Sequence, residues 1–214
     1  MSWSRRVASP EEARAALRDP GDALDLRAAA EPSPAWTGLG FVELVPGELV
    51  RPVGVQLIDV DATRALGARL AATLRAGDLV VLSGPLGAGK TALTQGIGAG
   101  LGVRGPVTSP TFVLARVHRG PLPLVHVDAY RLRADRGVGG QDAADVHLDD
   151  LDLDDELPHS VTVVEWGEGV VEALSLSRLE VTLDRGDRTT ETHPDHRTAH
   201  VLAVGPRWSV VHRP

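Results

Sequence analysis

The sequence contains no cysteine, few aromatic residues and no long apolar run. The absence of cysteine excludes disulfide bonds and thiolate metal sites. No apolar run approaches the roughly 18 residues that a membrane-spanning helix needs, and charged residues interrupt the N-terminal stretch where a signal peptide would carry its apolar core. We therefore expect a cytoplasmic protein with no membrane association.

Lysine is almost absent as well. All but one of the 22 lysine and arginine residues are arginine, and the exception is Lys90. A solitary lysine suggests a position that needs a compact ammonium group, where a planar guanidinium does not fit. The net charge of −7 argues against binding of nucleic acid by a broad basic face, but it is compatible with a role inside a nucleic-acid-processing complex.

The composition of the chain changes near residue 54. Residues 1–54 are rich in proline and alanine, and the pattern predicts only a short helix over 10–18, begun by Ser9. We predict a weakly structured or accessory N-terminal extension there, with no chemistry of its own. Residues 55–214 are long enough for one well-buried α/β core and form the second predicted domain.

A buried strand, a glycine-rich loop and a helix follow one another in the middle of the chain. Residues 79–82 are continuously apolar, as in a buried parallel strand, and residues 92–101 form a predicted helix closed by Gly102. Residues 84–91 match the P-loop pattern G-x-x-x-x-G-K-[ST] in full. The flanking elements leave little room for a chance match in a glycine-rich chain.

The P-loop pattern predicts binding of a nucleoside triphosphate. Glycine lets the loop turn its backbone N–H groups towards phosphate oxygens, and the following helix adds its positive end. Lys90 would reach the β- and γ-phosphates, and the Thr91 hydroxyl would bind Mg²⁺. The loop residues predicted to bind the nucleotide are Gly84, Leu86, Gly87, Ala88, Gly89, Lys90 and Thr91.

Two further apolar runs, 124–128 and 161–165, each end in an acid. Asp128 and Glu165 would therefore lie at the carboxyl edge of a parallel sheet, where ligands bind in open α/β folds. An acid there can hold Mg²⁺ or orient water, although either acid taken alone could merely cap the next turn. Two such acids beside a P-loop favour the functional interpretation.

The predicted fold is an α/β P-loop NTPase fold with a mostly parallel central sheet flanked by helices. Residues 179–183 and 199–204 alternate more clearly between apolar and polar, which predicts late antiparallel strands at the sheet edge. Residues 108–111 form a hydroxyl-rich loop that could be a switch segment near the γ-phosphate or an ordinary turn. Residues 135–156 hold nine acids and one arginine, which is typical of a solvated segment and, less often, of a docking surface for a basic partner.

These motifs together resemble the TsaE (YjeE) family, small bacterial ATPases of tRNA threonylcarbamoyladenosine synthesis. The resemblance covers roughly residues 55–210, and four motifs in the family's order are far more specific than any one of them. The motifs lie at residues 86–91, 108–112, 126–132 and 165–168.

The resemblance implies that the protein binds ATP and Mg²⁺ and works with TsaD- and TsaB-type proteins. Those partners transfer a threonylcarbamoyl group to the adenosine at position 37 of tRNA, so tRNA would be met only through the complex. By the same resemblance, Thr91 and Glu165 would bind Mg²⁺, and Asp128 would be the acid that hydrolysis needs. The resemblance also implies that Ser109 and Thr111 belong to a switch-like loop at the nucleotide and that Arg197 reaches the phosphates. Trp166 would lie near the nucleotide or at the partner surface.

The chain departs from the family pattern in three places. Pro85 stands where the family usually has an acid, the acidic run replaces a glutamate-rich helix after Arg131, and the N-terminal extension has no counterpart. Two other functions stay open: a small-molecule P-loop kinase, which would need an acceptor pocket, and a nucleotide-regulated binding module with little turnover. A guanine-specific switch is disfavoured because the chain has no Asn-Lys-x-Asp motif.

Overall fold

The structure is a computed structural model that describes residues 4–18, 25–29, 33–37, 42–45, 48–110, 113–130, 155–167, 175–185 and 196–208. Its elements, in chain order, are β1 (Ser4–Arg6), α1 (Pro10–Arg18), β2 (Asp25–Ala29), α2 (Pro34–Thr37), β3 (Val42–Val45), β4 (Glu48–Pro52), β5 (Gly54–Leu57), α3 (Val60–Ala71), β6 (Leu79–Ser83), α4 (Lys90–Leu101), β7 (Ala115–His118), β8 (Leu124–Asp128), η2 (Leu157–His159), β9 (Val161–Glu165), β10 (Arg178–Arg185) and β11 (Arg197–Val204). In this part of the chain, no helix has the length and hydropathy to cross a membrane.

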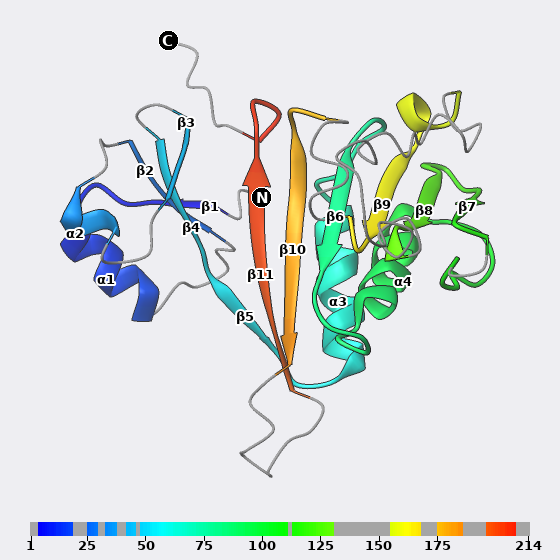
Figure 1. Ribbon diagram of the computed structural model, residues 1–214, viewed down its shortest axis with the longest axis horizontal. Helices are drawn as coiled ribbons and strands as arrows, with labels where there is room; N and C mark the ends of the chain where they lie inside the picture. Colours follow the sequence, from blue (N-terminus) through cyan, green and yellow to red (C-terminus); the bar gives the residue numbers. More distant parts are fainter. Residues whose placement is uncertain are drawn as a thin grey trace, which may run out of the picture.

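A seven-stranded mixed sheet in the order β5-β11-β10-β6-β9-β8-β7 extends from the middle of the molecule to one end, opposite the N-terminal elements (Figure 1). Strands β10, β6, β9 and β8 are parallel, whereas β5, β11 and β7 run antiparallel to their neighbours. The predicted α/β fold with a mostly parallel centre is confirmed.

The late strands differ in detail from the prediction. Residues 179–183 lie in β10, which pairs in parallel with β6 inside the sheet, while the outermost strands are β5 and β7. The two late strands, β10 and β11, pair antiparallel with each other as predicted, but β10 also pairs in parallel with β6. The apolar alternation of β10 reports that one face is buried, and a period of two carries no information about strand direction.

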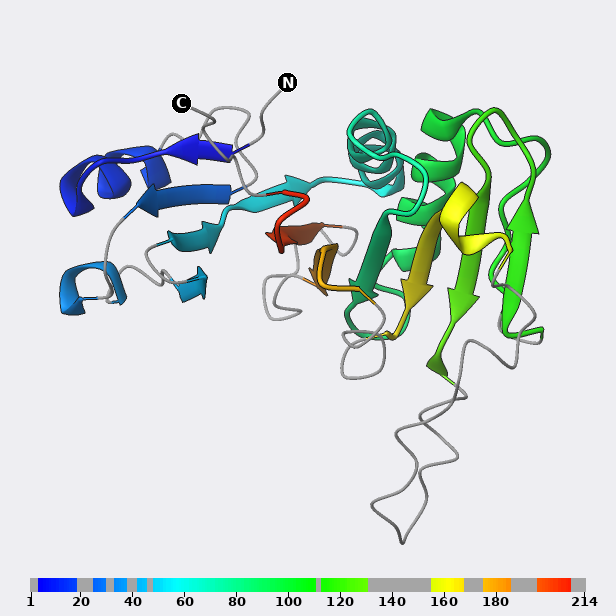
Figure 2. The same cartoon turned by 90° about the horizontal axis from the view of Figure 1, so that it is seen from above.

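Helices α3 and α4 pack together on one face of the sheet (Figures 1 and 2). Helix α3 begins at Val60 because the carboxylate of Asp59 caps it, accepting from the backbone N of Ala62 at 2.6 Å. Its buried residues recur at spacings of three and four, which gives one face towards the core. These residues are Thr63, Leu66, Gly67, Leu70 and Ala71.

Glycine allows the two helices to touch through their backbones. A Cβ atom added to Gly96 of α4 would lie 2.0 Å from the carbonyl oxygen of Arg64, and one added to Gly67 of α3 would lie 2.3 Å from the carbonyl oxygen of Leu93. No side chain fits at either position without moving a helix. This close packing fixes α4, and with it the loop that precedes α4.

The N-terminal residues contain more order than a weakly structured extension implies. Strands β1, β2, β4 and β3 form a second sheet, and the predicted helix over 10–18 is present as α1. Ser9 Oγ accepts from the backbone N of Glu12 at 3.1 Å and so caps the helix, and Glu12 Oε2 accepts from the backbone N of Ala8 at 2.8 Å, one residue before the N-cap. One cluster of buried apolar residues packs this unit together: Val7, Ala13, Ala16, Leu26, Ala28 and Val53.

One buried arginine connects the small sheet to the large one. Arg27 of β2 is 3% exposed, and its Nη2 donates to the carbonyl oxygen of Ala203 in β11 at 3.1 Å. The change from one sheet to the other falls between β4 and β5, close to the proposed boundary at residue 54. The division of the chain into two domains at that point stays a prediction.

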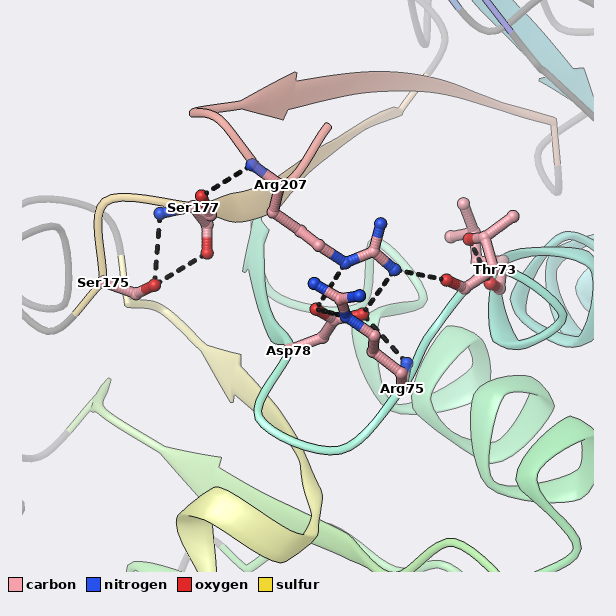
Figure 3. Close-up of polar contacts among 7 residues, drawn as sticks. Thr73, Arg75, Asp78, Ser175, Ser177 and Arg207 are labelled. Carbon is pink, nitrogen blue, oxygen red and sulfur yellow. Dashed lines mark hydrogen bonds and ion pairs between the residues drawn. The ribbon is translucent and has the colours of Figure 1, made fainter. Parts of the chain in front are cut away.

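Arg207 ties the end of β11 to the start of the strand that leads into the P-loop (Figure 3). Its guanidinium donates to both carboxylate oxygens of Asp78 at 3.2 Å and to the carbonyl oxygen of Thr73 at 3.0 Å, and its backbone N donates to Ser177 Oγ at 3.1 Å. Asp78 is 6% exposed. A buried carboxylate is costly without a partner, so the fold depends on this pair.

We expect Arg207→Leu to lower the free energy of unfolding by about 2–4 kcal/mol, because the variant leaves Asp78 buried without its main partner. The control is Arg119→Leu, which removes a similar two-oxygen contact, with Glu156, from an arginine that is 68% exposed. That change should cost less than about 1 kcal/mol. Denaturant unfolding measures both, and equal losses would contradict the account.

Candidate nucleotide-binding site

The loop between β6 and α4 has the conformation that its glycines permit. Gly84 has φ of 133°, and a Cβ atom there would lie 2.2 Å from the carbonyl oxygen of Leu183 in β10. Gly89, at the N-cap of α4, has φ of 107°. Both φ values favour glycine. The loop therefore wraps the N-terminus of α4, where backbone N–H groups and the helix dipole favour an anion.

Lys90 lies folded over this loop. Its side chain is 4% exposed, and Nζ donates to the carbonyl oxygens of Gly84 at 2.7 Å and Pro85 at 3.1 Å. Nζ also lies 3.6 Å from the centre of the Trp166 ring, a cation–π contact. Burial lowers the pKa of Lys90 from its ordinary value, while the nearby carboxylates of Glu165 and Asp128 oppose that shift. The only lysine of the chain is therefore at the phosphate-binding loop.

The two predicted acids lie side by side at the carboxyl ends of neighbouring parallel strands. Asp128 ends β8 and Glu165 ends β9, they pair in the sheet register, and they are 5% and 4% exposed. Glu165 Oε1 accepts from Thr91 Oγ1 at 2.9 Å, which connects the acid to the P-loop helix. Asp128 Oδ1 accepts from the backbone N of Tyr130 at 3.0 Å, which orients its carboxylate.

These side chains surround a cavity of about 250 Å³. Its lining brings together the loop, the start of α4, both acids and two further residues of the sequence prediction. The lining residues are Leu86, Gly87, Gly89, Lys90, Thr91, Ala92, Ser109, Asp128, Glu165 and Trp166. The predicted loop residue Ala88 is buried beside them, and Gly84 takes part through its carbonyl.

Three predicted features, two site residues and the acidic segment, are not part of the described lining of the cavity. Thr111 lies outside the described residues, as does nearly all of the acidic segment 135–156. Arg197 begins β11 and is not among the residues that line the cavity; its Nη1 donates to the carbonyl oxygen of His196 at 2.9 Å. The role of Arg197 at the phosphates stays a prediction.

Trp166 follows β9 in a left-handed conformation with φ of 62°. Such a conformation is uncommon for a bulky residue and costs of order 1–3 kcal/mol, so the surrounding structure has to impose it. Its backbone N donates to the carbonyl oxygen of Leu82 at 2.9 Å, and its ring centre lies 5.3 Å from that of Tyr130. The turn directs the indole towards Lys90 and the cavity.

Two polar residues at the site were not assigned a role from the sequence. A Cβ atom added to Gly87 would lie 2.0 Å from Arg185 Nη2, so the guanidinium of Arg185 covers the loop. This contact depends on the pairing of β10 with β6, and no local motif signals it. His126 is buried two residues before Asp128, and its Nε2 lies 2.9 Å from Glu165 Oε1. A histidine inside an apolar strand that ends in an acid was a usable signal.

The residues present fit a magnesium ion shared with a nucleotide. Among the described residues, no group of three or more His, Asp or Glu side chains forms a ready-made metal site. Mg²⁺ commonly takes one or two protein oxygen ligands and completes its coordination with phosphate oxygens and water. Thr91 Oγ1 and the Glu165 carboxylate, in contact at 2.9 Å, supply oxygen ligands of that kind.

Behind His126 lies a second buried histidine, His118 at the end of β7. It is 6% exposed, and the two ring centres are 6.3 Å apart. Burial, followed by the proximity of His126 and Arg116, lowers the pKa of His118 below its ordinary value of 6.5. The folded protein therefore favours the neutral form of this ring.

The lowered pKa predicts a loss of stability in acid. Below about pH 6.5, His118 of the unfolded chain binds a proton that His118 of the folded chain does not yet bind, so the free energy of unfolding falls as the pH falls. It stops falling once the pH is below the folded-state pKa of His118, where both states are protonated. We expect His118→Leu to remove this contribution. As the pH falls from about 7.5 to 5.5, the free energy of unfolding should decrease less in the variant than in the wild-type protein. Identical pH dependence of the two proteins would refute the assignment.

A buried strand, a glycine-rich turn, a helix N-terminus with Lys90 and Thr91, and two acids on adjacent strands define a P-loop nucleotide-binding protein. The family model for the threonylcarbamoyl adenosine biosynthesis protein TsaE matches residues 57–193. The chain belongs to the TsaE family.

Individual relatives agree with this assignment. The chain is 58% identical over 150 residues to the tRNA threonylcarbamoyladenosine biosynthesis protein TsaE of Streptomyces coelicolor, covering 68% of this chain and 93% of that protein. It is 34% identical over 157 residues to the protein of the same name in Bacillus subtilis, with 72% and 87% covered. The crystal structure of YdiB from Bacillus subtilis is similar with a TM-score of 0.53 and 32% identity, over 73% of this chain and 88% of that chain.

Proposed function

We propose that the protein is a Mg²⁺-dependent ATPase that supports threonylcarbamoyladenosine formation at position 37 of tRNA. Membership of the TsaE family supports the pathway. The convergence of Lys90, Thr91, Asp128 and Glu165 on one cavity supports the nucleotide chemistry, and it is the observation on which the proposal chiefly rests.

Different residues of the site carry out phosphate binding, metal binding and hydrolysis. The N–H groups of the loop bind the phosphates, and Lys90 Nζ exchanges the carbonyls of Gly84 and Pro85 for phosphate oxygens. Thr91 and Glu165 would hold Mg²⁺, which would supply positive charge to neutralise the phosphates. Asp128 orients the attacking water and accepts its proton, since its carboxylate lies beside that of Glu165 at the same edge of the sheet.

The partners are TsaD- and TsaB-type proteins, which carry out the transfer to tRNA in the cytoplasm. With a net charge of −7, the chain has a poor electrostatic basis for binding tRNA alone, so tRNA is met through the complex.

ATP hydrolysis by the purified chain, alone and with the two partners, tRNA and threonylcarbamoyl-adenylate, tests this proposal. We expect slow hydrolysis alone, faster hydrolysis with the partners, and repeated modification of tRNA. Phosphorylation of a metabolite would favour a kinase instead. Binding of ATP with no effect of the partners would favour a nucleotide-regulated binding module.

Lys90→Ala should weaken ATP binding on the order of 100-fold, because the phosphates lose a charged hydrogen-bond donor. Titration with a fluorescent ATP analogue measures this. Arg64→Ala, which changes an exposed cation paired with Asp61 on α3, is the control and should bind like wild type. Unchanged affinity in the Lys90 variant would contradict the role of the loop.

Asp128→Asn should keep ATP binding within a few-fold while hydrolysis falls by about 100-fold or more, since the amide cannot accept the proton of the attacking water as a carboxylate does. Single-turnover hydrolysis separates the two effects. Full activity of this variant would remove Asp128 from the mechanism.

A further inference from the structure

His126 is a polar residue in the least accessible part of the site. It is fully buried in β8, between the buried residues Val125 and Val127. Its Nε2 lies 2.9 Å from Glu165 Oε1, whereas its Nδ1 has no hydrogen-bond partner. An ionised carboxylate oxygen can only accept a hydrogen bond, so His126 Nε2 is the donor of this contact and Glu165 Oε1 is the acceptor.

The same carboxylate oxygen has two donors. Thr91 Oγ1 and His126 Nε2 each lie 2.9 Å from Glu165 Oε1, and they come from α4 and from β8. Two donors on Oε1 restrict the rotation of the carboxylate about the Cγ–Cδ bond of Glu165. The other oxygen, Oε2, has no hydrogen bond to the described residues, and Glu165 lines the cavity. The carboxylate is therefore held through Oε1, and Oε2 is available to a ligand in the cavity.

We propose that His126 is a positioning residue that holds the Glu165 carboxylate in the orientation needed to bind the Mg²⁺ of the nucleotide complex. The inference rests on the proposed function, because it assigns a metal to this cavity. A glutamate side chain has several rotatable bonds, and a ligand that is already oriented binds a metal more tightly. His126 acts through Glu165 and does not itself touch nucleotide or metal.

The competing explanation is that His126 only fills the core. A purely structural histidine would affect the binding of ATP equally with and without Mg²⁺, because it would act by distorting the fold. A positioning histidine affects only the part of the affinity that Mg²⁺ adds. The dependence of ATP binding on Mg²⁺ therefore separates the two explanations.

Two amide substitutions make the test specific. Gln places an amide nitrogen near the position of Nε2, within reach of Glu165, whereas Asn places it near that of Nδ1, out of reach. Both variants put a polar amide in the same buried position, so differences in folding largely cancel. His118→Asn is the matched control, since this neighbouring buried histidine has no hydrogen bond with Glu165.

The measurement is the affinity for a fluorescent ATP analogue, in EDTA and over a series of Mg²⁺ concentrations, with thermal denaturation of each variant alongside. For His126→Asn we expect the Mg²⁺ concentration at half-maximal effect to rise about 10- to 100-fold, with unchanged affinity in EDTA. His126→Gln and His118→Asn should stay within a few-fold of wild type.

Three results would overturn the inference alone: an Asn variant with wild-type dependence on Mg²⁺, an equal loss of affinity in EDTA and in Mg²⁺, or a Gln variant as defective as the Asn variant. If the wild-type protein binds the analogue with no dependence on Mg²⁺, the metal chemistry of the proposed function fails as well. The wild-type titration thus distinguishes the two failures.

Discussion

The hydrogen bonds to one oxygen, Glu165 Oε1, connect the elements on which the site is built. Through Thr91 they reach the P-loop helix α4, and through His126 they reach strand β8. Strand β9, which carries Glu165, pairs with β6 on its other side, and β6 leads directly into the loop. The loop, the helix and both acids therefore have one fixed geometry, and the fold has little freedom to separate them.

The charges of the site are balanced around the loop. Two buried carboxylates face the ammonium of Lys90, whose own burial disfavours its charge, and Arg185 adds a second cation above Gly87. Buried charges destabilise a fold unless each of them has a partner of opposite charge. Clusters of buried charged groups are therefore found mainly at sites where a charged ligand binds. A phosphate chain with Mg²⁺ brings charges of both signs and can pair with each of these groups.

The features that the sequence predicted are those encoded locally. The P-loop pattern identified Lys90 and Thr91, and apolar runs that end in an acid identified Asp128 and Glu165, because the carboxyl ends of parallel strands meet at one edge. Arg185 could not be predicted, since its place above Gly87 depends on the parallel pairing of β10 with β6. The N-terminal sheet was missed because its strands are short and its pairings join distant segments, such as β1 with β2.

The proposed function requires the loop and the two acids to bind ATP together with Mg²⁺ in the 250 Å³ cavity. A crystal structure with a non-hydrolysable ATP analogue and Mg²⁺ tests it most directly. We expect the phosphates to lie along the loop with Lys90 Nζ on the β- and γ-phosphate oxygens, and Mg²⁺ to be bound by Thr91 Oγ1 and the Glu165 carboxylate. A nucleotide bound elsewhere, or a metal held without Thr91 and Glu165, would contradict it.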